Sequence, residues 1–248
     1  MTRSSLALDR SVLRLDIVGS SAGGRDRQVY LDRALRAVVD RAIEHSAAYP
    51  VAESSYLRVD GDSATLLVGA AVAKAWLLAD FVLRETAIAL GEVNKPVNED
   101  HRLRVRMALD HGETVVNPPN IGGRAVATTA RLIDAPAFRQ AVAAAPGQDF
   151  GLIVSDRFHS DVVVDGERGL GRLEFRPIEV EVKDFRQTGW VYVPADEVPR
   201  RDAVPRSGAV PHGPAPSPAK LADTILQFNA AVHAQNSVFG LSRSDDRD

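Results

Sequence analysis

The connections between the predicted strands constrain the fold of this chain most strongly. Residues 56–68, "YLRVDGDSATLLV", place Asp60-Gly61 between two apolar runs, which is a strong signal for a β-hairpin. Residues 103–109, "LRVRMAL", alternate apolar and basic side chains as a half-buried strand does, and the following "ETVV" is interpreted as a returning strand. Connections this short cannot be the crossovers that parallel strands require, so a simple repeat of parallel βαβ units is excluded.

Helical patterns separate these strands. Apolar residues recur at helical spacing in the segment that begins at residue 22, in residues 71–91 and in residues 123–145, where Pro136 marks a break. Further strands are predicted at residues 12–18, 150–155, 173–182 and 189–193, and a short helix follows the strand at 150–155. The order of elements predicts an α+β fold, a ferredoxin-like split βαβ sheet with helices packed on it.

Composition divides the chain into one domain and an appendage. The domain spans residues 12–193 after a lead-in at 1–11. Residues 194–218 are rich in proline and poor in apolar residues, which is typical of a linker. Residues 219–240 are expected to form an amphipathic helix that docks either on the domain or on a protein partner, and residues 241–248 are expected to be a disordered tail.

Composition also excludes several classes of function. The chain has no cysteine, which rules out disulfides, thiolate metal sites and a cysteine nucleophile, and fits the reducing cytoplasm. Its net charge of -3 provides no basic field for nucleic acid. The longest apolar stretch contains Lys74 and Asp80, so no membrane span is expected. We therefore expect a cytoplasmic protein without a nucleic-acid or membrane partner.

A carboxylate interrupts the apolar strand "LRLDIVGSS", residues 13–21. Asp16 is costly in such a strand unless it is paired, and Asp62 lies at the tip of the hairpin that a split βαβ fold places beside this strand. Two hard oxygen ligands suit Mg²⁺ or Mn²⁺ bound to a triphosphate. The alternative is a pair of solvated aspartates near turns, and spacing alone favours that interpretation.

Glycines and small hydroxyls follow Asp16 directly and lead into the first predicted helix. Backbone N–H groups at a helix N-terminus can hold phosphates. The candidate residues of this turn are Ile17, Val18, Gly19, Ser20 and Ser21.

Four motifs in register resemble one family. "LRLDIVGSS", "DGDSATLLV", "LRVRMALDHGE" and "GGRAVATTARLIDAP" occur in the order and at the separations typical of the class III nucleotidyl cyclases, the adenylyl/guanylyl cyclase catalytic domains. The resemblance runs from about residue 12 to 193 and includes the closing "GWVYVP". It implies a head-to-tail homodimer in which one subunit provides the metal-binding aspartates and the other provides an arginine.

The resemblance assigns a role to each matching position. Asp16 and Asp62 match the aspartates that hold two Mg²⁺ or Mn²⁺ ions, and residues 17–21 match the phosphate-binding turn. Arg131 matches the arginine that stabilises charge on the phosphates, for which a permanent charge and a planar fork of donors are suited. Lys183 matches a phosphate-binding lysine of the last hairpin. Without the motif, Arg131 is interpreted as a solvated or ion-paired helix residue.

Three positions depart from the family pattern. Ala127 stands where the family has an asparagine that holds the ribose, and its side chain cannot form a hydrogen bond. Arg58 and Asn120 stand at the base-recognition positions, where neither the adenine nor the guanine pattern is present. Arg58 as a donor to a base carbonyl slightly favours uracil or guanine, while its place on an edge strand is typical of a surface arginine, so the base is left open.

Two functions from different classes follow from these residues. The first is a signalling enzyme, a phosphorus–oxygen lyase that converts a nucleoside triphosphate to a 3′,5′-cyclic nucleotide and pyrophosphate. The second is a degenerate cyclase-homology module that binds nucleotide or a partner protein without turnover. Asp16, Asp62 and Arg131 favour the enzyme by a small margin, whereas Ala127 favours the module.

Overall fold

The structure is a computed structural model that describes residues 6–46, 51, 55–182 and 184–194. Lys183, the predicted linker after residue 194, the predicted helix at 219–240 and the tail at 241–248 lie outside the described residues. None of the helices within the described ranges is long and apolar enough to cross a membrane.

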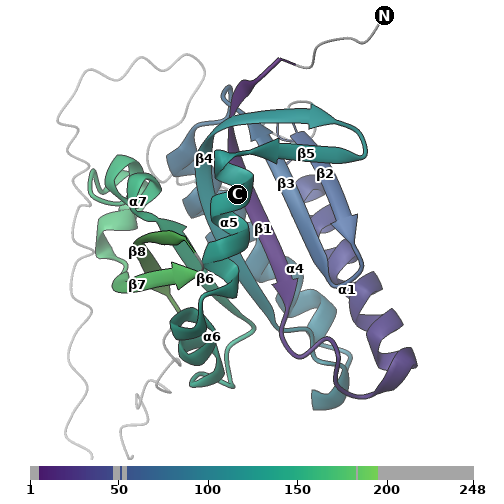
Figure 1. Ribbon diagram of the computed structural model, residues 1–248. Coiled ribbons are helices and arrows are strands. Elements are labelled where there is room, and N and C mark those ends of the chain that lie inside the picture. Colours follow the sequence, from purple (N-terminus) through teal and green to yellow (C-terminus); the bar gives the residue numbers. More distant parts are fainter. Residues whose placement is uncertain (1–5, 47–50, 52–54, 183, 195–248) are drawn as a thin grey trace, which may run out of the picture. The chain divides into compact units, whose positions relative to one another are not determined.

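The described strands form one eight-stranded sheet in the order β2-β3-β1-β4-β6-β8-β7, with β5 paired to the far part of β4 (Figure 1). Only the β4–β6 pair is parallel among the described pairs. The strands are β1 (Leu8–Ile17), β2 (Ser55–Asp60), β3 (Ser63–Gly69), β4 (Val105–Asn117), β5 (Asn120–Gly123), β6 (Phe150–Ser155), β7 (Arg176–Val182) and β8 (Phe185–Tyr192). The mixed α+β fold predicted from the sequence is confirmed.

Helices connect these strands. They are α1 (Gly24–His45), α3 (Lys74–Trp76), the π-helical η1 (Leu77–Glu85), α4 (Thr86–Asn94), η2 (Glu99–His101), α5 (Arg124–Asp134), α6 (Pro136–Ala143), α7 (Asp156–Val162) and η3 (Glu167–Arg172). α5 and α6 separate at Ala135-Pro136, as the proline predicted. α3, η1 and α4 follow one another without interruption.

One prediction about the strands is wrong. "ETVV", residues 113–116, does not return along residues 103–109 but continues β4 in the same direction, because the neighbouring β1 also extends and pairs Leu8 with Thr114. The chain reverses at Pro118-Pro119, and β5 then pairs with the end of β4. The predicted hairpin at residues 56–68 is present as β2 and β3.

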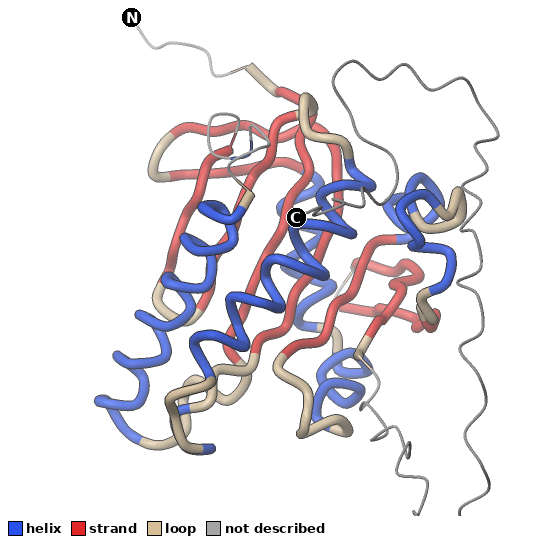
Figure 2. Tube along the Cα trace, turned by 180° about the vertical axis from the view of Figure 1, so that it is seen from behind, coloured by secondary structure: helices blue, strands red, loops and turns tan. Residues whose placement is uncertain are grey.

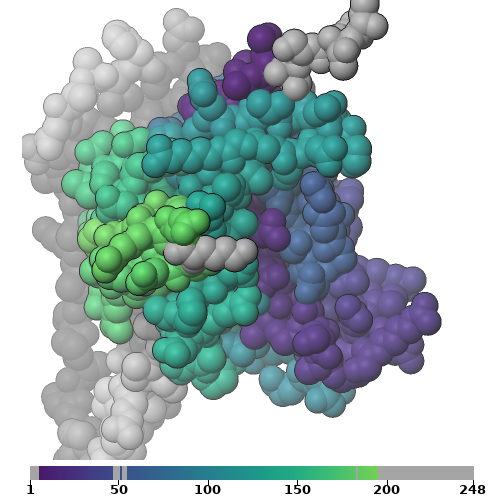
Figure 3. Space-filling view, viewed as in Figure 1, coloured from purple at the N-terminus to yellow at the C-terminus, as the bar shows by residue number. Residues whose placement is uncertain are grey.

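The helices cover both faces of the sheet. Alternate residues of β1, among them Leu13 and Leu15, join the large core beneath α1, η1 and α4, which cross the sheet in the rear view (Figure 2). Val12 points the other way and packs with Ala125 of α5. By strand alternation Asp16 lies on this α5 face. α5 covers only part of it, and Figure 3 shows purple atoms of β1 at the surface beside α5.

Two histidines lie in packed surroundings, His159 buried and His111 half-buried. His159 of α7 stacks on Trp190, with ring centroids 3.8 Å apart. His111 of β4 lies 3.1 Å, Nε2 to Oδ2, from Asp161, whose carboxylate also accepts from Lys74. Burial lowers the pKa of His159 against an opposing contribution from Asp156. Burial, assisted by Lys74, likewise lowers the pKa of His111.

These histidines predict acid-sensitive stability. In the unfolded chain both take up a proton near pH 6.5, whereas in the fold they stay neutral to lower pH. Between the pKa that each histidine has in the unfolded chain and its lower pKa in the fold, the unfolded state binds more protons. The free energy of unfolding therefore falls as the pH drops below about 6.5. The thermal unfolding midpoint, measured from pH 8 to pH 5, should fall, and the slope should flatten in His111→Gln/His159→Phe. An equal slope in this double variant would contradict the assignment.

Candidate functional site

The end of β1 and the turn between β2 and β3 lie side by side. Asp16 is opposite Ser63 of β3 and opposite Arg106 of β4 in the strand register. The Ile17 amide donates a hydrogen bond to the backbone carbonyl of Asp62, 3.0 Å away. The carboxylate of Asp62 is one of the groups that raise the pKa of Asp16. The structure therefore brings together the two aspartates that the sequence singled out.

Each carboxylate has one oxygen engaged. Arg106 donates through Nη2 to Asp16 Oδ2, and the Ser20 hydroxyl donates to Asp62 Oδ2 at 2.6 Å. The second oxygen of each carboxylate accepts no hydrogen bond from the part of the chain that the structure describes. These two open oxygens belong to neighbouring strand ends, and carboxylate oxygens are ligands that a hard divalent cation prefers.

The electrostatic balance around Asp16 supports the same fit. Burial raises the pKa of Asp16; Arg106 lowers it, and the charges of Asp62 and Asp134 raise it again. The net direction is upward, so the single guanidinium does not fully offset the burial of negative charge. No group of three or more acidic or histidine side chains that could hold a metal occurs within the described residues. Substrate oxygens and water would have to complete a coordination shell here.

The predicted phosphate-binding turn runs from β1 into α1. Gly19 and Gly23 adopt φ values of +68° and +85°, a region that glycine enters without strain. Arg27, in the first turn of α1, donates to the backbone carbonyls of Gly19 and Ala22 at 2.9 and 2.8 Å. Its Nε also donates to the carbonyl of Asp100 at 2.6 Å. The turn is thus held in a fixed shape at a helix N-terminus, where backbone amides favour anions.

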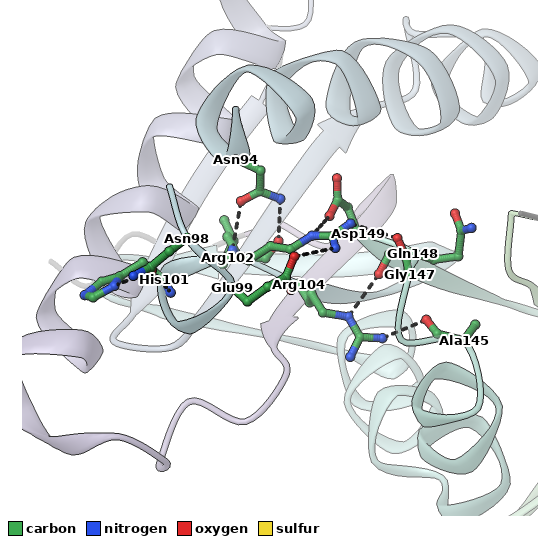
Figure 4. Close-up of polar contacts among 11 residues, drawn as sticks. Asn94, Asn98, Glu99, His101, Arg102, Arg104, Ala145, Gly147, Gln148 and Asp149 are labelled. Carbon is green, nitrogen blue, oxygen red and sulfur yellow. Dashed lines mark hydrogen bonds and ion pairs between the residues drawn. The ribbon is translucent and has the colours of Figure 1, made fainter. Parts of the chain in front are cut away.

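A polar network surrounds the residues that lead into β4, next to this turn (Figure 4). The Arg104 guanidinium donates three hydrogen bonds of 2.9–3.0 Å to backbone carbonyls at the end of α6 and in the loop after it. Arg102 pairs with Asp149 at 2.7 Å, and the Asn94 side chain bonds both backbone groups of Leu103. The backbone at the start of β4 is therefore rigid, and its Arg104 carbonyl accepts the amide of residue 18 at 2.8 Å.

Arg131 does not join the two aspartates within one chain. It lies on the exposed side of α5, and its Cζ sits 4.9 Å from the ring centroid of Phe185 on β8. No ion pair or hydrogen bond connects it to Asp16 or Asp62 in the described residues. Ala127, one turn earlier, is also exposed. Both side chains face outward, where a second molecule can reach them.

The predicted base-recognition residues also lie apart from a common site. Arg58 on β2 forms an ion pair with Asp60, with Nε and Oδ2 2.7 Å apart. Asn120 is exposed at the start of β5, opposite Asn117. The Arg58 guanidinium is thus held by a carboxylate of its own strand.

Three site residues were missed in the sequence. Arg106 was interpreted only as an outward-facing residue of an alternating strand, although its register partner is Asp16. Arg27 gave no signal, because its acceptors are backbone carbonyls. Asp32 of α1 has a buried Oδ1 without a hydrogen-bond partner among the described residues, and burial together with the charge of Asp62 raises its pKa. Only the Arg106–Asp16 pair could have been found, by aligning the two strands.

Gly123 fixes the entry into α5 and hence the placement of residues 127 and 131. It has φ +123°, and an added Cβ would lie 2.3 Å from the Glu113 carbonyl oxygen. We expect Gly123→Ala to destabilise the fold by about 2 kcal/mol or more, since this backbone region is essentially reserved for glycine. Gly122→Ala, whose Cβ meets nothing within 4 Å, is the control and should change stability by less than about 0.5 kcal/mol. Equal denaturation midpoints for the two variants would contradict this account.

The sequence and the structure of this chain were compared with those of known proteins. No family model matches the chain, and no curated protein matches it. Among solved structures, an adenylate/guanylate cyclase/hydrolase from Silicibacter pomeroyi matches with a TM-score of 0.53 and 20% identity, over 77% of this chain and 100% of that one. This chain has a class III cyclase-like fold. The guanylyl cyclase Cya2 also matches, with a TM-score of 0.49 and 16% identity over 76% of this chain and 92% of that one. The fold expected from the cyclase resemblance is confirmed.

Proposed function

We propose that this class III cyclase-like chain is a nucleotidyl cyclase, which converts a nucleoside triphosphate to a 3′,5′-cyclic nucleotide and pyrophosphate. The observation that carries the proposal is that Asp16 and Asp62 lie at neighbouring strand ends beside the glycine turn, and that each has an open carboxylate oxygen. A cyclase-like fold alone does not carry it, because folds host many functions.

The chemistry assigns a task to each group. In the reaction the 3′-hydroxyl releases its proton to water and its oxygen attacks the α-phosphorus, while the bond from that phosphorus to the bridging oxygen breaks and pyrophosphate leaves. Asp16 and Asp62 would hold two divalent ions, which lower the pKa of the 3′-hydroxyl and neutralise phosphate charge. Within the turn at residues 17–21, the amides of residues 19–21 would bind phosphate oxygens, because those of residues 17 and 18 already donate to backbone carbonyls, and Ser20 holds the Asp62 carboxylate in place. Lys183 is proposed as a further phosphate contact.

Arg131 requires a second copy of the chain. It is exposed on α5 and makes no polar contact with the aspartates of its own chain among the described residues. In a head-to-tail homodimer, Arg131 of one copy would meet the metal aspartates of the other, where its guanidinium stabilises charge on the transferring phosphorus. Each active site would then be incomplete in a single chain.

Ala127 favours a second candidate, a cyclase-homology module without turnover. An alanine offers no hydrogen bond to the ribose, and Arg58 is engaged by Asp60 rather than presented to a base. Such a module would bind a metal–nucleotide complex or a partner protein, with the predicted helix at 219–240 as one contact.

Incubation with each of ATP, GTP, CTP and UTP in the presence of Mn²⁺, with product detection by mass, separates the two candidates. The cyclase predicts slow formation of one cyclic nucleotide with an equal amount of pyrophosphate. Mn²⁺-dependent nucleotide binding without product from any of the four would favour the module. Absence of both would contradict the metal site.

A further inference from the structure

The pair formed by Arg106 and Asp16 is set by the sheet itself. The two residues are directly opposite each other on β4 and β1 and therefore lie on the same face. Their side chains are only 14% and 19% exposed. Asp16 Oδ2, the oxygen that accepts from Arg106, belongs to a proposed metal ligand.

Arg106 does not use all of the N–H donors of its guanidinium. Nη2 bonds Asp16, while Nε is buried without a hydrogen-bond acceptor among the described residues. Asp16 Oδ1 is open to a divalent ion, but Oδ2 is not while Arg106 holds it, so the ion meets a carboxylate that is half engaged and whose charge the guanidinium already offsets. A divalent ion has twice the charge of the guanidinium and coordinates the oxygen directly, so it can displace this contact, but only against the strength of a charge-assisted hydrogen bond.

We infer that Arg106 is an internal counter-ion that occupies Asp16 in the metal-free protein and competes with the divalent ion for it. The inference rests on the proposed function, because it takes Asp16 as a metal ligand. Metal alone should therefore bind more weakly than two open carboxylates would allow. Once displaced, the guanidinium needs another anion, so metal binding becomes coupled to the arrival of the triphosphate.

Mn²⁺ binding to the full chain, followed by the loss of the free Mn²⁺ paramagnetic resonance signal, tests the competition without any need for activity. Arg106→Met should tighten Mn²⁺ binding at least about tenfold in the absence of nucleotide, because it removes a charge-assisted hydrogen bond of ordinary strength. Arg106→Lys keeps the charge but lacks the planar fork, and should tighten binding less than Arg106→Met. If Arg106→Met fails to fold, Arg106→Lys still tests the competition.

Arg14→Met is the matched control. Arg14 lies on the same face of β1, two residues before Asp16, but its register partner is Ala108 and its side chain approaches the Thr65 hydroxyl at 3.5 Å. Its removal deletes the same charge from the same face without freeing Asp16. Mn²⁺ binding should change by less than about threefold, as expected for loss of a long-range surface interaction.

The double variant Arg106→Met/Asp16→Asn separates the inference from the function on which it rests. If the tightening appears with Arg106→Met, is absent with Arg14→Met and is lost with Asp16→Asn added, the competition is supported. If wild-type binding depends on Asp16 but Arg106→Met and Arg106→Lys leave it unchanged, the competition is wrong and the metal site stands. If no variant binds Mn²⁺ through Asp16, both are wrong.

Discussion

Asp62→Asn is expected to weaken Mn²⁺-dependent triphosphate binding roughly hundredfold or more, with the fold intact. The substitution removes one of two carboxylates from the proposed metal site, and a neutral amide oxygen is a much weaker ligand for a hard cation than a carboxylate oxygen. An asparagine keeps the size of the side chain and can still accept a hydrogen bond from the Ser20 hydroxyl, so the turn should keep its shape. Calorimetric titration with Mn²⁺ and each triphosphate measures the change.

Asp60→Asn is the control for this prediction. Asp60 belongs to the same hairpin, but its carboxylate pairs with Arg58 instead of facing Asp16. Its loss should leave metal-dependent binding within about threefold of the wild type, as expected for a surface ion pair. Equal weakening by both substitutions would show a general effect of hairpin charge and would overturn the assignment of Asp62.

Ala127→Asn is expected to raise the cyclase rate roughly a hundredfold, the usual contribution of one preorganised hydrogen-bond donor in a transition state. Ala127 is exposed on α5, so the larger side chain meets no packing barrier. Asparagine is a poorer helix former than alanine by about 0.5 kcal/mol, which the helix can absorb. Initial rates with the triphosphate that the wild type prefers provide the measurement.

Ala127→Asp is the matched control, because aspartate has the shape of asparagine without its N–H donors. It should bring no gain. Arg131→Ala, added to Ala127→Asn, should abolish the gained activity. A rate unchanged by Ala127→Asn would place the missing ribose contact elsewhere, and a wild type inactive with all four triphosphates that stays inactive in this variant would favour the non-catalytic module.

Local patterns were sufficient to predict much of the fold. The hairpin at residues 56–68, the alternating strand at 103–109 and the helix break at Pro136 depend on turn chemistry and side-chain periodicity, which neighbouring residues determine. The continuation of β4 through residues 113–116 was missed, because it depends on pairing with β1, about a hundred residues away in the sequence. Strand length follows from such partners rather than from local composition.

Part of the candidate site could also be predicted from the sequence, and part of it could not. Asp16 and Asp62 could be predicted as neighbours, because a split βαβ fold places the first strand beside the hairpin. The contact of Arg106 could have been found only by aligning two strands that are distant in the sequence, and the contacts of Arg27 could not be found, since their acceptors are backbone carbonyls. Arg58 and Asp60 form an ion pair although they are only two residues apart on one strand. The sequence alone does not distinguish an arginine paired in this way from one that is free to bind a base.

Complementation between two inactive variants tests the central claim, an active site shared by two copies, most directly. Asp62→Asn and Arg131→Ala should each be inactive alone. Random exchange in an equal mixture gives half heterodimers, each with one intact site, so about one quarter of the wild-type cyclic nucleotide should form. An active wild type whose mixed variants stay inactive, in subunits shown to exchange, would place the whole site within one chain and contradict the account.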